Sequence, residues 1–271
     1  MDLIKYIPES LTEKEISLLK DAFSIAEKSG EILMRYFRKN GLLQSTKQNE
    51  KDIVTIADKE SEAFIIDYIR SHFPTHGIIS EESGSKNEDR DYRWIIDPLD
   101  GTTNFWRGLP VFCVSIALEY KEEAILGVVF APYLHECFYA IKHKGAWLNN
   151  KLLSCSDNAL LSQSVVATGM PYDRAENPDN NLQEINKIAL CVRGLRRMGS
   201  AAIDLCYVAA GFFDAYWELN LNRWDIAAGQ LIAKEAGAIV QPIRSDRNYS
   251  LLVSNSFLYP SLHKLLKNNY Q

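Results

Sequence analysis

Residues 94–104 read Trp-Ile-Ile-Asp-Pro-Leu-Asp-Gly-Thr-Thr-Asn, and this stretch constrains the fold of the chain more than any other. The apolar residues 94–96 prefer β structure and predict a buried strand. Because Pro98 has no amide proton for a sheet ladder, the strand is expected to end there. Asp97 and Asp100 would then lie together at the carboxyl end of the strand.

The residues after the two acids predict an anion site. Gly101 allows a ligand to approach the backbone closely, and residues 101–103 offer consecutive amide groups. If a short helix begins there, these amides would bind an anion. Carboxylate oxygens beside such a site suit Mg²⁺ that bridges to a phosphate. The alternative is an ordinary Asp-Gly turn with a capping threonine.

Three segments together resemble one known family. Residues 97–104, Asp-Pro-Leu-Asp-Gly-Thr-Thr-Asn, resemble the metal-binding signature of the inositol monophosphatase family, whose members are Mg²⁺-dependent, Li⁺-sensitive phosphomonoesterases. Residues 77–83, Gly-Ile-Ile-Ser-Glu-Glu-Ser, resemble its first acidic element, and residues 224–229, Trp-Asp-Ile-Ala-Ala-Gly, resemble its third. Each segment alone has an ordinary structural explanation, such as an acid in a first helical turn. Three in the family's order and approximate spacing are a specific signal that extends over nearly the whole chain.

The fold that the resemblance implies is α+β or α/β, a layered αβαβα sandwich of the inositol monophosphatase and fructose-1,6-bisphosphatase type. The residue patterns agree, because a long amphipathic helix from the capping box at Thr12 to about residue 39 precedes a helix at 57–73. A run of strands follows, and strands alternate with helices in the second half. We expect a single domain over residues 1–271, with a metal and phosphate subdomain at about 1–153 and a substrate subdomain at 154–271.

Metal binding is also implied by the resemblance, with two or three Mg²⁺ ions in the site. Glu81, Asp97 and the carbonyl of Leu99 would hold the first ion. Asp97, Asp100 and Asp225 would hold the second, and a third, weaker ion would lie near Glu81. The charges agree with this, since several cations need several carboxylates and a phosphate dianion completes the balance.

The catalytic groups implied by the resemblance are Glu81, Thr102 and Asp58. The amides of Gly101 and Thr102 would hold the phosphate. A metal-bound water, activated by Glu81 and by Thr102 linked to Asp58, would attack phosphorus in line with the leaving alkoxide. Lys47 matches a lysine on the family's mobile loop. The alternatives are an ordinary first-turn acid for Asp58 and a solvated lysine for Lys47.

Substrate choice is expected to depend on the second half. Glu218 matches an acid that accepts hydrogen bonds from inositol hydroxyls, and Arg197 resembles an arginine of bacterial members. The chain departs from the family pattern at residues 241–248, which lack the usual acidic, glycine-containing turn, and we expect this to affect only a surface turn. At Asn222-Arg223 many relatives carry Arg-Pro. The substrate contacts implied by the resemblance are Asp100, Gly101, Thr102, Arg197, Gly199, Ser200, Ala201, Glu218 and Asp225.

The favoured function is hydrolysis of myo-inositol monophosphate or a similar polyol phosphate. Alternatives within the enzyme class are fructose-1,6-bisphosphatase, 3′-phosphoadenosine 5′-phosphate phosphatase and histidinol-phosphate phosphatase activities. A nucleotide substrate calls for a basic, aromatic-lined pocket, and Glu218 argues mildly against it. A non-enzymatic alternative is a regulatory partner of the transcription machinery, because bacterial relatives include such members.

Composition bears on partners and location. The net charge of −5 argues against a nucleic-acid-binding surface as the main function. The first ten residues have no apolar segment typical of a signal peptide, and no run is long enough to span a membrane. The five cysteines stand singly with no Cys-x-x-Cys spacing, which fits reduced thiols. We expect a cytoplasmic protein without membrane contact, and the resemblance implies a homodimer.

Overall fold

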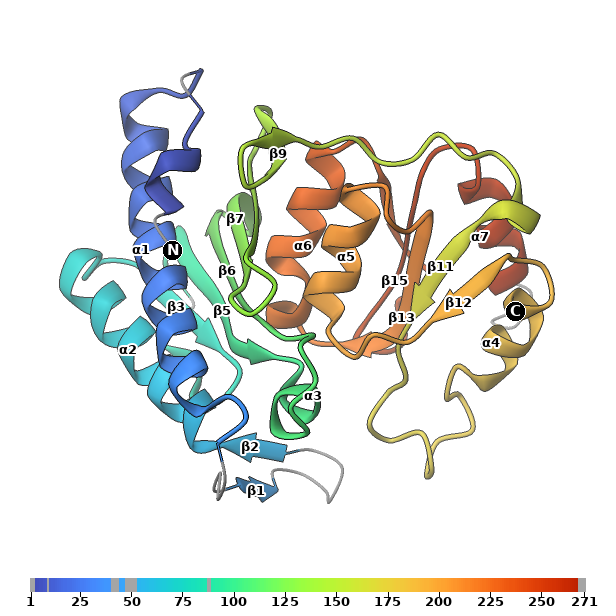
Figure 1. Ribbon diagram of the computed structural model, residues 1–271, viewed down its shortest axis with the longest axis horizontal. Coiled ribbons are helices and arrows are strands. Elements are labelled where there is room, and N and C mark those ends of the chain that lie inside the picture. The colour runs from blue at the N-terminus through green and yellow to red at the C-terminus, as the bar shows by residue number, and fades with distance from the viewer. Residues whose placement is uncertain (1–2, 9, 40–43, 47–52, 87–88, 268–271) are drawn as a thin grey trace.

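The computed structural model of the protein describes residues 3–8, 10–39, 44–46, 53–86 and 89–267. Two large sheets and three layers of helices alternate from one side of the molecule to the other, and a third sheet has only two strands (Figure 1). The layered αβαβα sandwich expected from the sequence is therefore confirmed. Within the ranges just given, no helix combines the length and the apolar character that a membrane span needs.

The first half of the chain builds an eight-stranded sheet in the order β10-β9-β8-β7-β6-β5-β3-β4. Only β3 and β5 pair in parallel, so both present their carboxyl ends at the same edge. The remaining neighbours pair antiparallel. The strands are β3 (Gly77–Ser80), β4 (Gly84–Lys86), β5 (Tyr92–Asp100), β6 (Cys113–Tyr120), β7 (Glu123–Ala131), β8 (Glu136–Ile141), β9 (Gly145–Leu148) and β10 (Lys151–Leu152).

Helices α1 (Glu13–Tyr36) and α2 (Ile56–His72) cover the outer face of this sheet. The capping box predicted at the start of α1 is confirmed, because the side chain of Glu15 accepts the amide of Thr12 at 2.8 Å. The apolar faces of α1 and α2 pack with the sheet into a continuous core that includes Phe23 and Trp94. A short two-stranded sheet, β1 (Gln44–Thr46) with β2 (Ile53–Thr55), precedes α2.

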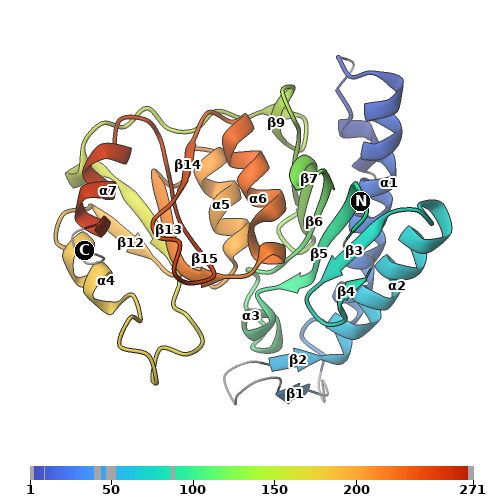
Figure 2. The ribbon, with the colours of Figure 1, turned by 180° about the vertical axis from the view of Figure 1, so that it is seen from behind.

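The second half builds a five-stranded sheet in the order β12-β11-β13-β15-β14. Helices α5 (Ala201–Ala209) and α6 (Arg223–Glu235) lie between the two sheets, and their small, apolar side chains fill the central core. Helices α4 (Leu182–Ala189) and α7 (Tyr259–Lys267) cover the outer face (Figure 2). The strands are β11 (Val165–Thr168), β12 (Gly194–Arg196), β13 (Ala215–Leu221), β14 (Ile239–Pro242) and β15 (Tyr249–Ser254), and two 3-10 helices span Leu3–Tyr6 and Leu161–Gln163.

One edge of the molecule collects the segments that carry the predicted site. The short helix α3 (Thr102–Trp106), the β1–β2 pair and the connection between β11 and α4 all project from this edge, and both views agree (Figures 1 and 2). The strands of residues 1–153 and those of 154–271 belong to different sheets. The division into a metal subdomain and a substrate subdomain stays a prediction.

Three local expectations were wrong. The strand that was expected to end at Pro98 continues to Asp100, because the pairing of β5 with β6 shifts register between Asp97 and Asp100 and leaves the proline outside the regular ladder. The high charge of residues 83–92 predicts a surface loop, but this segment contains the edge strand β4. Helix α1 ends at Tyr36, three residues earlier than expected.

Candidate active site

The bulge at the end of β5 shapes the first part of the site. Asp97 is 2% exposed, and its Oδ1 accepts the amide of Leu99 at 3.0 Å. The carbonyl oxygen of Leu99 lies 3.0 Å from the hydroxyl oxygen of Thr102, and it is one of two possible acceptors for the single hydroxyl proton. Gly101 follows with a φ of +89°, and a Cβ atom there would lie 2.8 Å from the carbonyl oxygen of Val111. Only glycine fits this left-handed and crowded position.

Helix α5 fixes the orientation of Asp100. Its Oδ2 accepts the hydroxyl of Ser200 at 2.7 Å and the amide of Ala202 at 2.8 Å. The same Ser200 caps α5 by accepting the amide of Ile203. The hydrogen bonds from Ser200 and Ala202 both reach Oδ2, so the start of α5 fixes how this carboxylate is turned.

The predicted pair of Asp58 and Thr102 is in contact. The hydroxyl of Thr102 lies 3.1 Å from Oδ1 of Asp58, to which it donates. Oδ2 of Asp58 accepts both the amide and the hydroxyl of Thr55, at 2.9 and 2.5 Å. Thr55 precedes α2, and Asp58 is its third residue, so the helix start holds the acid in place. Three donors converge on this buried carboxylate, which can therefore orient the threonine hydroxyl.

Glu81 and Asp225 approach the bulge from two other elements. Glu81 directly follows β3, and its amide donates to the carbonyl of Ile96 in β5 at 3.3 Å. Asp225 is the third residue of α6, and its Oδ2 accepts the amide of Asn222 at 2.6 Å. Asp225, Glu81 and Asp100 are each partly exposed, unlike Asp97. The carboxylates thus meet around a single, almost fully buried aspartate.

Crowding of these acids perturbs their protonation. Burial, the charge of Glu81 and then the charges of Asp100 and Asp225 raise the pKa of Asp97 well above its ordinary value. Burial raises the pKa of Asp100 to about 6, although hydrogen bonds from Ser200 and Ala202 lower it. Burial, followed by the charge of Glu81, also raises the pKa of Asp225. Four mutually repelling carboxylates gain most from a cation placed between them.

The donor set suits Mg²⁺. Carboxylate and carbonyl oxygens are hard ligands of the kind that this ion prefers. Within the described residues, no group of three or more His, Cys, Asp or Glu side chains is already gathered in ligand geometry. The charges of Glu81, Asp100 and Asp225 lie close enough to Asp97 to raise its pKa, so the residues fit the ion by chemistry and charge. The number of ions and the ligand assignments stay predictions.

The predicted substrate residues form a second group beside the acids. The hydroxyl of Tyr216 donates to Oε2 of Glu218 at 2.5 Å. A Cβ atom at Gly169 would lie 1.9 Å from that same oxygen, so the absence of a side chain at Gly169 makes room for the carboxyl group. Burial raises the pKa of Glu218 to about 7, while Tyr216 and the nearby charge of Arg197 lower it. The apolar run at residues 213–217 predicts a strand with Glu218 at its end, but Glu218 lies within β13.

The segment at residues 198–201 is tied to the signature. The Nδ2 group of Asn104 donates to the carbonyl of Met198 at 2.8 Å and lies 3.5 Å from that of Gly199. Ser200 and Ala201, which follow, open α5 next to Asp100, and the amide of Ala201 also lowers the pKa of that acid. The structure therefore brings together the predicted residues of both halves, except Lys47, which lies outside the described residues.

Two acids near the site were missed from the sequence. Glu62, in α2, accepts the hydroxyl of Ser80 at 2.5 Å and the amide of Ser83 at 2.9 Å, so it holds the segment that carries Glu81. Asp204, in α5, is 1% exposed, and its Oδ1 has no hydrogen-bond partner among the described residues. Burial and the charge of Glu218 raise its pKa well above the ordinary value. Neither acid belongs to a sequence pattern that predicts its position near the site.

Comparison with known proteins agrees with this geometry. The model of the inositol monophosphatase family matches residues 15–270. The Nus factor SuhB of Pasteurella multocida strain Pm70 is 42% identical over 233 residues, which are 86% of this chain and 87% of that protein.

Two solved structures share the fold. The inositol monophosphatase from Anabaena (Nostoc) sp. PCC 7120 is 38% identical with a TM-score of 0.84, over 93% of this chain and 96% of that one. The extragenic suppressor protein suhB from Bartonella henselae is 37% identical with a TM-score of 0.85, over 93% of this chain and 98% of that one. The match over residues 15–270 and the relatives above 30% identity establish that this chain belongs to the inositol monophosphatase family.

Proposed function

We propose that the protein is an Mg²⁺-dependent phosphomonoesterase that hydrolyses myo-inositol monophosphate or a similar polyol phosphate. The observation that carries the proposal is the meeting of Glu81, Asp97, Asp100 and Asp225 beside the Asp58–Thr102 pair. Mutual repulsion among the acids favours bound cations. The pair of the Thr102 hydroxyl and the Asp58 carboxylate supplies a proton acceptor beside them. The family match and the similarity to an inositol monophosphatase structure support this reading.

The chain's own groups would divide the work of ester hydrolysis. Bound Mg²⁺ would supply charge neutralisation and a water of lowered pKa. Because the hydroxyl of Thr102 donates to Asp58, its oxygen can accept a hydrogen bond from the attacking water. Glu81 would take up the proton of that water. The phosphorus–oxygen bond to the alcohol would break as the new bond to the water oxygen forms, and the leaving alkoxide would take a proton from solvent, which yields inorganic phosphate and the free alcohol.

Glu218 supports a polyol substrate. Its carboxyl group is held by Tyr216 and can accept hydrogen bonds from vicinal hydroxyls when it is ionised. The same negative charge would repel a second phosphate group. We therefore place fructose-1,6-bisphosphate and 3′-phosphoadenosine 5′-phosphate, which carry two phosphates, behind inositol monophosphate as substrates. Histidinol phosphate has a single phosphate but lacks vicinal hydroxyls, so it also ranks behind inositol monophosphate.

Phosphate release from these four substrates, measured with Mg²⁺ and with EDTA, tests the proposal. We expect Mg²⁺-dependent turnover, with the highest kcat/KM on inositol monophosphate. An Asp97→Asn variant is the matched control, because it keeps the shape of the side chain and removes its charge. Absence of Mg²⁺-dependent turnover on every substrate, or equal turnover by the variant, would contradict the proposal.

A regulatory role in transcription is the second candidate, because relatives at 40–42% identity are named Nus factor SuhB. Chromosomal replacement of the gene by the Asp97→Asn form separates the two roles in the native host. Full rescue of a deletion phenotype by this form would favour the non-enzymatic role. Failure to rescue, with normal protein levels, would favour the phosphatase.

A further inference from the structure

The connection between β11 and α4 begins and ends beside Glu218. We call residues 170–180 the substrate loop. Gly169, just before it, lies against the carboxyl group of Glu218. Asn181, just after it, donates to the carbonyl of Gly169 at 2.6 Å and to the hydroxyl of Thr168 at 2.8 Å, and it accepts the indole N–H of Trp217 at 2.7 Å. Both ends of the loop are thus fixed next to the predicted selectivity acid.

The body of the substrate loop has no comparable apolar anchor. Of residues 170–180, only Pro171 is buried, and Tyr172 is 55% exposed. A segment with so little buried apolar surface depends on polar contacts for its position. Within the loop, the side chain of Asn177 donates to Asp173 at 3.2 Å and that of Asn180 donates to the carbonyl of Arg174 at 3.1 Å.

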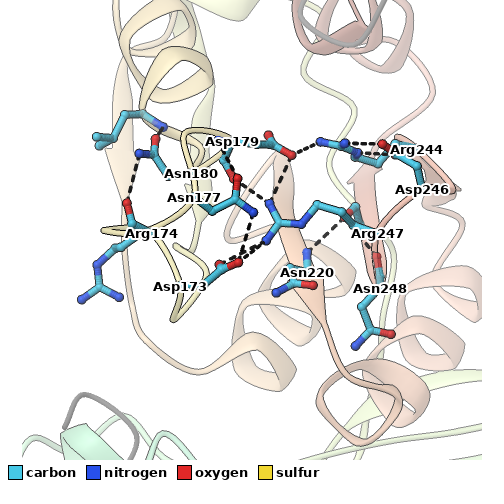
Figure 3. Close-up of polar contacts among 12 residues, drawn as sticks. Asp173, Arg174, Asn177, Asp179, Asn180, Asn220, Arg244, Asp246, Arg247 and Asn248 are labelled. Carbon is cyan, nitrogen blue, oxygen red and sulfur yellow. Dashed lines mark hydrogen bonds and ion pairs between the residues drawn. The ribbon is translucent and has the colours of Figure 1, made fainter. Parts of the chain in front are cut away.

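Two arginines from the turn at residues 243–248 supply further contacts (Figure 3). Arg247 donates from Nη2 to both carboxylate oxygens of Asp173, at 2.9 and 3.1 Å. Its Nη1 donates to the carbonyl of Asp179 at 2.6 Å and to the carboxylate of Asp179 at 3.1 Å. Arg244 also donates to the carboxylate of Asp179 and forms two bonds with Asp246, at 2.6 and 2.5 Å. Both arginines therefore converge on the substrate loop.

The pairs that both arginines form with Asp179 are shielded from solvent, whereas Asp173 is 41% exposed and Asp246 is 68% exposed. The side chains of Arg244 and Arg247 are each 13% exposed, and that of Asp179 is 27% exposed. In the pair of Lys142 with Glu123, on the other sheet, the glutamate is 65% exposed. Partly buried guanidinium groups with several carboxylate bonds are more rigid than exposed lysine pairs. The contacts can therefore fix the loop in one position.

The same turn also contacts the start of α6. The side chain of Asn248 donates to Oδ1 of Asn222 at 3.0 Å, and the amide of Asn222 is bound by Asp225. The turn thus lies between the substrate loop and the helix start that carries a predicted metal ligand. The sequence predicts that residues 241–248 form only a surface turn, but the arginines of this segment bind the substrate loop.

We propose that Arg247, together with Arg244, is a positioning residue that fixes the substrate loop beside Glu218 and thereby sets how tightly the polyol part of a substrate is bound. The proposal rests on the phosphatase function proposed above. It concerns substrate affinity and leaves the bond-breaking step to the groups around Asp97. If the Arg247 contacts only stabilised the fold, their loss would lower the melting temperature without changing the preference among substrates.

An Arg247→Ala variant tests the anchoring directly. Trypsin cleaves after Arg174 inside the substrate loop, and mass spectrometry identifies the fragment that ends there. We expect cleavage after Arg174 to become about tenfold faster in the variant, because loosening exposes the loop to the protease. Arg247→Lys keeps the charge but loses the paired N–H donors of the guanidinium group. Its cleavage rate should therefore lie between those of the wild type and Arg247→Ala. Lys142→Ala, which breaks an exposed pair far from the loop, should cleave there like the wild type.

Kinetics at saturating Mg²⁺ tests the effect on selection. For myo-inositol monophosphate we expect KM to rise about 5- to 20-fold in Arg247→Ala, with kcat within about twofold of the wild type. For 4-nitrophenyl phosphate, which has no polyol hydroxyls, KM should change by less than about twofold. Arg247→Lys should recover part of the loss in affinity, and Lys142→Ala should match the wild type on both substrates.

The outcomes separate this proposal from the phosphatase assignment. Unchanged cleavage after Arg174 in Arg247→Ala would overturn the anchoring. Faster cleavage with an unchanged KM, or an equal rise of KM for both substrates, would overturn the role in selection. A wild-type chain without phosphatase activity would overturn the proposed function, and the trypsin experiment would still decide whether Arg247 anchors the loop.

Discussion

Protonation of Glu218 should control the preference for polyol phosphates. Burial raises the pKa of this carboxyl group to about 7, and the hydrogen bond from Tyr216 opposes the rise. With that pKa, about nine-tenths of the groups are ionised at pH 8 and about one-tenth at pH 6. Only the ionised form can accept hydrogen bonds from two substrate hydroxyls without giving up an oxygen to its own proton.

The Glu218→Gln variant removes the charge and keeps the size of the side chain. Loss of a charge-assisted hydrogen bond costs about 1.5–3 kcal/mol, or about tenfold to a hundredfold in kcat/KM for inositol monophosphate. If the wild type exceeds the variant about 30-fold at pH 8, the ratio should fall to about threefold at pH 6. Fructose-1,6-bisphosphate should lose less, because its second phosphate is repelled by the carboxylate.

The assay compares the two proteins in the same buffers, so that titration of the substrate phosphate cancels in the ratio. Tyr216→Phe provides a matched variant. Because the tyrosine hydroxyl lowers the pKa of Glu218, its removal should move the midpoint of the pH dependence upward. A ratio between wild type and Glu218→Gln that does not change with pH, or a midpoint that moves downward in Tyr216→Phe, would refute the reasoning.

Four further outcomes follow from the site. In Asp97→Asn, the melting temperature without Mg²⁺ should equal or exceed that of the wild type, because repulsion among the carboxylates is relieved. The rise in melting temperature on adding Mg²⁺ should largely disappear. A full rise, measured by scanning fluorimetry, would contradict the assignment of Asp97 as a ligand. Thr102→Ala should lower kcat by about 10²- to 10⁴-fold with the Mg²⁺-induced rise intact, and Thr102→Ser should recover most of the phosphate release. In EDTA, stability should fall as pH rises from about 4.5 to about 7, because the folded protein keeps a proton on Glu218 that the unfolded chain has lost; urea titrations should show a flatter profile for Glu218→Gln. LiCl should inhibit turnover more than NaCl at equal ionic strength, and equal responses would count against a site with several cations.

The sequence predicted well the features that depend on local patterns. The strand, the acids and the threonines of residues 94–104 follow one another along the chain, so their order alone placed them at one edge of a sheet. The capping box at Thr12 is equally local, and it is confirmed. The position of Pro98 inside β5 was missed, because a shift in strand register depends on how two strands pair and leaves no mark in one of them.

Contacts between distant segments could not be predicted from the pattern. Arg247 binds Asp173 and Asp179, which lie 74 and 68 residues away in the chain. These partners meet only when β11, β14 and β15 join in one sheet, and charged residues in turns usually remain solvated. Glu62 was missed for the same reason, since its partners Ser80 and Ser83 come from a different element.

Two of the predicted active-site acids have a second duty in the fold. Asp58 and Asp225 are each the third residue of a helix, and each binds the backbone amide of the residue before that helix, Thr55 or Asn222. A related protein that had lost catalytic activity would still need both acids to stabilise the first turns of α2 and α6. Their retention in a sequence therefore says little about whether a member of the family remains an enzyme. The hydroxyl of Thr102 caps no helix, so its loss would be the more informative sign that catalysis has been abandoned.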